Sequence, residues 1–149
     1  VRSPALAWEF AAKPSDFGGW LQGGSVSPLI WNVEGSISGS ITGGDPKILS
    51  PDNLGVDISN AKYVRIRMRN RTSDTEAQIF FVTEAASSWD EKRSVRFPIV
   101  PNDAEFREYV VNIGSKGDWK GILRQLRLDP AHSATSGGFD LDYIRIQSW

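Results

Sequence analysis

Three arginines in one alternating segment have residue types and a spacing suited to ligand binding. From residue 63 to 70, apolar side chains alternate with Arg65, Arg67 and Arg69. Because successive side chains of a strand point to opposite faces, the apolar residues face the core and the arginines face outward. Residues 58–73 hold five cationic side chains and no acidic one. The pattern indicates a surface whose guanidinium groups bind hydroxyls or carboxylates, and a solvated edge strand explains it equally well.

Two later segments turn complementary groups outward. Gln78 and Phe80 share one face of the next alternating segment, and Arg127 points away from the leucines beside it. An aromatic ring packs against the CH face of a pyranose, and amide and guanidinium groups bind its hydroxyls. We therefore expect one sheet face to carry Arg67, Gln78, Phe80 and Arg127 and to bind carbohydrate.

Trp89 is the best loop candidate among the tryptophans. A lone tryptophan is more often a core residue, but Trp89 lies in the polar stretch 87–92, which keeps it near solvent. The candidate carbohydrate-binding residues are therefore Arg67, Arg69, Gln78, Phe80, Trp89 and Arg127.

Acidic residues near the two ends of the chain form a second pattern. Asp142 shares a face with Ile144 and Ile146, the core side of the last strand, where a carboxylate needs a partner. First and last strands of a sandwich often lie close together, which would bring Glu9 to Asp142. Two carboxylates in contact need a cation, and an all-oxygen site suits Ca²⁺. A turn cap or an arginine partner explains Asp142 equally well.

Catalytic groups are few. The single histidine, His132, lies in a loop of small residues, and cysteine is absent, which excludes a histidine-based metal centre, a Ser-His-Asp relay and a thiolate site. A lyase centre would combine Arg67 with Tyr63 or Tyr109. Nothing singles out a glycosidase pair among the available carboxylates, and we assign no catalytic residue and expect a protein that is not an enzyme. Those carboxylates are Asp45, Asp90, Glu105 and Asp129.

Composition limits the class of protein. The 149 residues, with six Trp, seven Phe and three Tyr, suffice for one domain with a buried core. A formal charge of −1 excludes a generally basic nucleic-acid binder. No run approaches the roughly 18 apolar residues of a spanning helix. Residues 1–7 do not have the pattern of a signal peptide, so any secretion signal is expected to lie outside this sequence.

The elements that position these residues are expected to be short strands. Paired glycines and scattered prolines leave little room for long helices. One-turn helical pieces are expected at 59–62 and 120–123. The spacing of the strands predicts an all-β sandwich, or jelly roll, of two antiparallel sheets. The segments predicted as strands are 36–41, 63–70, 77–83, 94–100, 105–113, 123–129 and 139–147.

Seven short segments together carry a family resemblance. They are 8–10 (WEF), 43–46 (GGDP), 64–70 (VRIRMRN), 78–81 (QIFF), 119–121 (WKG), 126–130 (LRLDP) and 140–146 (DLDYIRI). With them, nearly the whole chain resembles bacterial carbohydrate-binding modules with a galactose-binding-like jelly roll, common in secreted polysaccharide-degrading enzymes and surface proteins of Paenibacillus-type bacteria. The resemblance implies a structural Ca²⁺ held by Glu9 and Asp142, and glycan binding on the concave sheet or at the loop rim.

The resemblance also implies a function. It is that of a single non-catalytic carbohydrate-binding module over residues 1–149, excised from a larger secreted or cell-surface protein, that targets a catalytic domain of the same polypeptide to a polysaccharide. The arginine stripe favours an anionic polysaccharide such as xanthan. We expect a monomer with no nucleic-acid or membrane partner. The alternatives are a small polysaccharide lyase or glycosidase, and a structural or adhesion domain of a cell-surface protein.

Overall fold

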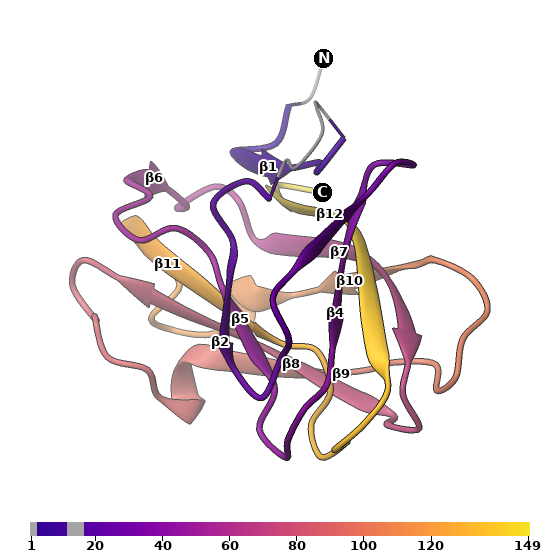
Figure 1. The fold of residues 1–149 in the computed structure, drawn as a ribbon. Coiled ribbons are helices and arrows are strands. Elements are labelled where there is room, and N and C mark those ends of the chain that lie inside the picture. The colour runs from indigo at the N-terminus through magenta and orange to yellow at the C-terminus, as the bar shows by residue number, and fades with distance from the viewer. Residues whose placement is uncertain (1–2, 12–16) are drawn as a thin grey trace.

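The structure, a computed structural model, describes residues 3–11 and 17–149. These residues form two antiparallel sheets packed face to face, with two short 3-10 helices in the connections (Figure 1). The helices are η1 (Glu91–Arg93) and η2 (Ile113–Ser115). The predicted all-β sandwich of two antiparallel sheets is confirmed.

One layer, which we call sheet A, contains the last strand of the chain at its centre. β1 (Leu6–Trp8) pairs with the C-terminal half of that strand. The last strand is β12 (Gly138–Gln147). In spatial order the strands of the sheet are β10 (Arg107–Val111), β7 (Tyr63–Arg71), β12, β4 (Ser36–Ser40) and β3 (Ile30–Asn32).

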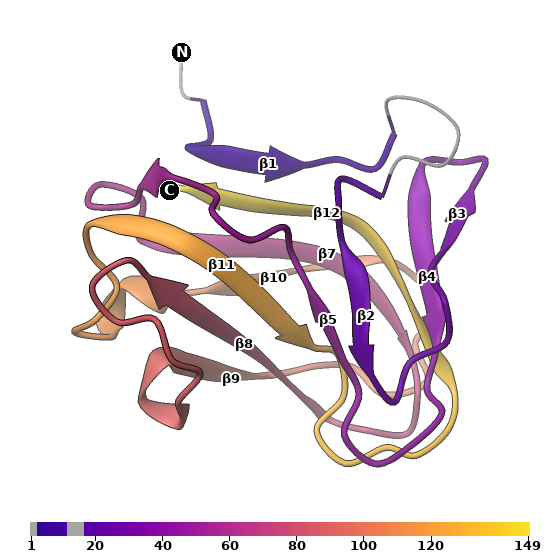
Figure 2. The same ribbon diagram turned by 60° about the vertical axis from the view of Figure 1, so that its left-hand side comes forward.

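The second layer, sheet B, is centred on β11 (Ile122–Asp129). β6 (Val56–Asp57) pairs with the N-terminal end of β11. Figure 2 shows this layer in front of β7 and β10. In spatial order its strands are β2 (Leu21–Gly24), β5 (Lys47–Leu49), β11, β8 (Glu76–Thr83) and β9 (Ser94–Pro98).

The core between the sheets follows from the alternation along each strand. Val64, Ile66 and Met68 of β7 are fully buried, whereas the arginines between them are partly exposed. Ile79 and Phe81 of β8 enter the same core from the other sheet. Each large apolar side chain buried in this way contributes about 1.5–3 kcal/mol to folding. The inward faces of β7 and β8 are thus fixed, and their outward faces follow.

The first and last strands are neighbours. Trp8 of β1 lies opposite Ile144 of β12, and the amide of Ala5 donates to the carbonyl of Ile146 at 2.8 Å. Figure 2 shows β1 running alongside β12. The expected closeness of the first and last strands is confirmed.

The strand predictions are confirmed for β4, β7, β8, β9, β10, β11 and β12. The strands that the sequence did not indicate, β1, β2, β3, β5 and β6, have two to four residues each, too few for a periodic pattern. Both expected one-turn helices are wrong. Residues 59–60 form a turn, and Gly121, with a φ of 75°, leads the chain directly into β11. Within the described residues, no helix has the length and apolarity to cross a membrane.

Candidate functional site

Register pairs place five residues in a row across the outer face of sheet B. Residues directly opposite each other on antiparallel strands share a face. The residues of this row point away from the core, whereas their neighbours Ile79 and Phe81 in β8 point into it. Its β2 end is apolar and exposed. In spatial order the residues, which we call the Arg127 row, are Leu21, Leu49, Arg127, Phe80 and Ser94.

Arg127 covers the ring of Phe80. Its guanidinium carbon lies 3.8 Å from the centroid of the Phe80 ring and 5.6 Å from that of Trp89. Two hydrogen bonds, from Nε and Nη2 to the carboxylate of Asp129 at 2.9 and 3.0 Å, hold it there. The outward direction of Phe80 is confirmed, but only 5% of Phe80 is exposed. The ring therefore supports Arg127 and is not an open platform for a sugar.

Trp89 is an accessible aromatic side chain beside this row, in the loop 84–93. It keeps 37% of its surface exposed, as expected from its polar neighbours. The buried Arg93 anchors the loop, because its Nε donates to the Ser88 carbonyl at 3.0 Å and its Nη2 to the Ser88 hydroxyl at 2.6 Å. A third bond joins Arg93 Nη1 to the carboxylate of Asp118 at 2.9 Å. These contacts fix the loop that presents Trp89.

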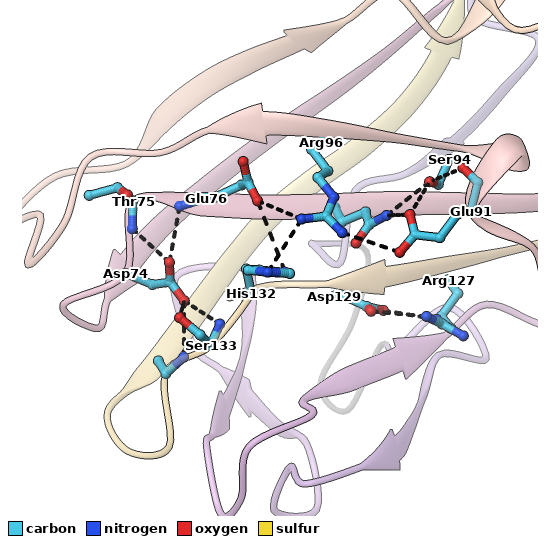
Figure 3. A network of polar contacts seen from close by, with 12 residues as sticks. Asp74, Thr75, Glu76, Glu91, Ser94, Arg96, Arg127, Asp129, His132 and Ser133 are labelled. Carbon is cyan, nitrogen blue, oxygen red and sulfur yellow. Dashed lines mark hydrogen bonds and ion pairs between the residues drawn. The ribbon is translucent and has the colours of Figure 1, made fainter.

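A polar row lies next to the Arg127 row, two residues away from it in β11, β8 and β9. Asp129 pairs with Gln78, and Gln78 with Arg96. The amide of Gln78 donates to the Glu91 carboxylate at 2.6 Å and to the Ser94 hydroxyl at 2.9 Å, and Arg96 Nη2 donates to Glu91 at 3.2 Å (Figure 3). Gln78 and Asp129 are buried, with 3% and 7% of their surfaces exposed, whereas Glu91 and Arg96 are exposed and can bind sugar hydroxyls. We call Asp129, Gln78 and Arg96, together with Glu91, which binds the last two, the Gln78 row.

Local pairing sets the pKa values of the carboxylates on this face. Burial raises the pKa of Asp129, although the hydrogen bonds from Arg127 act to lower it. The hydrogen bond from Gln78 is the main cause that lowers the pKa of Glu91. The ammonium group of Lys47, 2.8 Å from Asp45, lowers the pKa of that carboxyl. The charged groups of the face thus come as opposite pairs.

The arginines of β7 lie on the outer face of the other sheet. The prediction that Arg67 shares a face with the candidates of β8 and β11 is wrong, because β7 belongs to sheet A. Arg67 Nη1 donates to Asp142 at 2.7 Å, and Arg69 Nε donates to Asp140 at 2.7 Å. Both guanidinium groups also lie over Phe106, at 5.2 and 5.0 Å from the ring centroid. The acids that pair with Arg67 and Arg69 therefore come from β12, far along the chain, whereas Arg65 pairs with Glu108 of β10 at 2.7 Å.

Both expected calcium ligands are paired with arginines. Glu9 accepts hydrogen bonds from Arg145 at 2.6 and 2.8 Å, and Asp142 accepts one from Arg67. The expectation that Asp142 faces the core is wrong, because β12 shifts register against β7 just after Leu141. Within the described part of the chain, no group of three or more His, Cys, Asp or Glu could hold a metal ion. These contacts do not fit the predicted Ca²⁺ site formed by Glu9 and Asp142.

Comparison of the fold with solved structures identifies its kind. A variant of a family 29 carbohydrate-binding module has a TM-score of 0.66 at 13% identity, with 96% of this chain and 90% of that chain covered. A second family 29 variant, bound to mannohexaose, has a TM-score of 0.62 at 13% identity, with coverages of 96% and 92%. This chain has the fold of carbohydrate-binding modules.

The carbohydrate-binding module fold also occurs within a larger neighbour. The glycoside hydrolase domain structure of Endo-D from Streptococcus pneumoniae matches with a TM-score of 0.55 at 13% identity, over 87% of this chain and 21% of that one. No family model and no curated protein matches the sequence. At these identities the likeness establishes the fold.

Sequence reasoning found part of this face. Gln78, Phe80, Arg127 and Trp89 lie on or beside it, as expected, but Lys47, Leu49, Ser94 and Arg96 were not singled out. Leu49 and Lys47 lie in β5, which has three residues and no periodic signal. Arg96 lies in a predicted strand, and only the register of β9 against β8 shows which residues it joins. Asp129 was placed on the face of Arg127 and considered as a possible glycosidase acid, but it was not singled out as the partner of Arg127.

Proposed function

We propose that this chain is a non-catalytic carbohydrate-binding module whose ligand is a polysaccharide bound on the outer face of sheet B. The observation that carries the proposal is the placement of the exposed Trp89 beside Arg127 on the outer face of sheet B, where Glu91 and Arg96 are also exposed. The indole can cover the CH face of a pyranose while the exposed Glu91 and Arg96 bind its hydroxyls. Neighbours of the same fold in complexes with mannohexaose and cellulohexaose support the proposal.

The direction of the rows supports an extended ligand that crosses the strands. The Arg127 row spans all five strands from β2 to β9, which is about 19 Å at ~4.8 Å between neighbouring strands. Several linked pyranoses cover such a span, so each sugar needs to contribute only a small part of the binding free energy. Exposed Leu21 at one end and Trp89 near the other would be the apolar contacts of the outermost sugars.

Arg127, held in place by the buried Asp129, is expected to contact the ligand. Two family 29 variants made to probe ligand recognition replace an arginine and an aspartate that lie two positions apart. Arg127 and Asp129 have the same spacing. Because its bidentate pair holds the guanidinium in place, Arg127 would bind a hydroxyl without first being ordered, which reduces the entropic cost of binding.

The charges of this face favour a neutral polysaccharide. Each arginine of the β7 stripe is also paired with a carboxylate. The preference for an anionic polymer rested on that stripe, so an anionic polysaccharide such as xanthan becomes the second candidate, favoured by the partly exposed guanidinium groups at low salt. On the face of sheet B, three cations are paired with four carboxylates. Lys47 pairs with Asp45, Arg96 with Glu76 and Glu91, and Arg127 with Asp129.

The contacts of the catalytic candidates favour binding over catalysis. Tyr109 lies opposite Ile66 and packs against Phe97 on the core side, whereas Arg67 points outward, so these two do not form a lyase centre. Asp90 caps η1 through a hydrogen bond from the amide of Lys92 at 3.0 Å. Because the fold also occurs within a glycoside hydrolase chain, we place the module beside a polysaccharide-degrading catalytic domain in a secreted or cell-surface protein, as a monomer.

Native affinity gels containing neutral or acidic polysaccharides, run at low and high salt, test the proposal. Reducing ends and unsaturated products are measured in the same samples. We expect retardation in at least one neutral gel, little changed by salt, and no product. Retardation confined to acidic gels and lost at high salt would favour the anionic candidate. Product formation would establish an enzyme instead, and no retardation in any gel would favour a structural or adhesion domain.

A further inference from the structure

A polar hollow lies at the end of the sandwich where β8 begins and β11 has ended. Its volume is about 260 Å³. Drug-sized ligands fill pockets of about 300–1,000 Å³, and a single hexose is smaller than such ligands. The hollow is thus of a size for one sugar. The residues that line it, which we call the Ser73 hollow, are Ser73, Asp74, Thr75, Ser133 and Ala134.

Asp74 makes the walls of the hollow rigid. Its carboxylate accepts hydrogen bonds from four backbone amides, those of Thr75 at 2.8 Å, Glu76 at 3.2 Å, Ser133 at 2.6 Å and Ala134 at 2.9 Å. Burial acts to raise the pKa of Asp74, but these four bonds outweigh it and hold the pKa below its usual value. One charged side chain therefore joins the loop before β8 to the loop after β11.

The loop before β8 is also held in place by a buried side chain, that of Asn70. Asn70 is fully buried, and its amide donates to the carbonyl of Asp74 at 2.9 Å and to that of Val100 at 3.1 Å. The hydroxyl of Thr72 donates to Asn70 Oδ1 at 2.6 Å. A ligand that enters the Ser73 hollow meets walls already in their bound positions, which lowers the entropic cost of binding.

The hydroxyls of the hollow are available. Within the described part of the chain, the side-chain hydroxyls of Ser73 and Thr75 have no hydrogen-bond partner, and both residues are exposed. Ser133 Oγ reaches Asp74 only at 3.4 Å. Each hydroxyl can both donate and accept, which suits the hydroxyls of a sugar.

A short polar bridge joins the hollow to the Gln78 row. Glu76 precedes Gln78 by two residues in β8. Arg96 Nη1 lies 3.2 Å from the carboxylate of Glu76 and 3.3 Å from Nε2 of His132. Figure 3 shows these side chains between Asp74 and Ser133 on one side and Glu91 on the other. At ~3.3 Å per residue, Thr75 lies about 10 Å from the Gln78 row.

We propose that the Ser73 hollow receives a neutral sugar branch of the polysaccharide whose backbone lies on the rows of sheet B, so that the ligand class is a branched polysaccharide. This inference rests on the proposed function. A backbone that crosses the strands would project its substituents along them, toward the hollow. A branch of one or two sugars spans the separation. The carboxylates of Asp74 and Glu76 at the hollow oppose an acidic branch.

Matched oligosaccharides test the inference by titration calorimetry. Cellulohexaose is compared with xyloglucan oligosaccharides, which carry branches on the same backbone, and mannohexaose with galactosyl-branched mannan oligosaccharides. We expect the branched member of at least one pair to bind about tenfold more tightly, from one or two added hydrogen bonds. Ser73→Phe fills the hollow and is expected to lower branched binding to the linear level. Thr75→Val, which removes only a hydroxyl, is expected to weaken branched binding roughly threefold.

Ser148→Phe is the control, because Ser148 lines a separate hollow at the other end of β12. It is expected to change neither affinity. Thermal unfolding of each variant shows that it is folded. If linear chains bind but branched chains bind no more tightly, or if Ser73→Phe and Thr75→Val leave the preference unchanged, the branch inference is wrong and the proposed function stands. If no linear or branched chain binds, the proposed function fails as well.

Discussion

Replacing Trp89 with alanine removes the aromatic surface that this face offers to a sugar. Trp89 keeps 37% of its surface exposed, which for a tryptophan is about 80 Å². Covering that area with the CH face of a pyranose contributes about 2 kcal/mol at ~25 cal/mol per Å². Trp89→Ala is therefore expected to weaken polysaccharide binding roughly thirtyfold, measured by titration calorimetry with the oligosaccharide that the wild-type chain binds best.

The fold should survive this change. The loop is anchored by Arg93, and the loss of the contact between Trp89 and Arg127 costs about 0.5 kcal/mol, so the melting temperature should fall by no more than about 3 °C. Val110→Ala, at an exposed position of β10 in sheet A, is the matched control and should leave binding unchanged. A folded Trp89→Ala variant that binds within twofold of the wild type would refute the placement of the ligand.

Four further expectations follow from the contacts. Arg67→Ala should change the affinity for polysaccharide less than twofold, because Arg67 belongs to sheet A; a larger loss would move the site. A double-mutant cycle with Arg127→Ala and Asp129→Ala in urea unfolding should give a coupling of about 1–2 kcal/mol, whereas additive effects would mean that the pair adds nothing to stability. Asp140→Asn should cost about 2 kcal/mol at pH 7. Burial acts to raise the pKa of Asp140, but hydrogen bonds led by those from Arg71 hold it below its usual value. A depressed pKa gives its full stabilisation above the pKa of the unfolded state and loses it as the pH falls through the folded pKa; the cost should therefore shrink as the pH falls below about 4, and an equal cost at pH 3 would contradict this. EDTA should leave the melting temperature unchanged, and a fall of several degrees would establish a Ca²⁺ site.

The alternation along single strands could be predicted from the sequence. Side chains of β7, of β8, and of β11 after its register shift between Leu123 and Gln125 take the faces that a period of two assigns to them, because one face of each strand must enter the core. The assignment fails at Asp142, where the register of β12 shifts after Leu141. A bulge of this kind leaves no mark in the apolar pattern of a single strand. The faces were therefore predictable, and the irregularity was not.

The grouping of the strands into sheets could not be predicted. β7 and β8 follow each other in the chain but belong to different sheets, so Arg67 and Phe80 lie on opposite outer faces of the sandwich. The acid that pairs with Arg69 is Asp140, 71 residues later. Such pairs depend on long-range register, which local spacing does not encode. The burial of Phe80 under Arg127 depends on the same cross-strand register.

The tryptophan indole signals in an NMR titration test the central claim most directly. The chain has six tryptophans, and Trp89→Phe assigns the Nε1–H signal of Trp89. On addition of the best-bound oligosaccharide, we expect the Trp89 signal to shift while that of Trp119, whose indole is buried and donates to the Ala61 carbonyl at 2.7 Å, stays in place. Binding that leaves the Trp89 signal unmoved would contradict a ligand site on the outer face of sheet B.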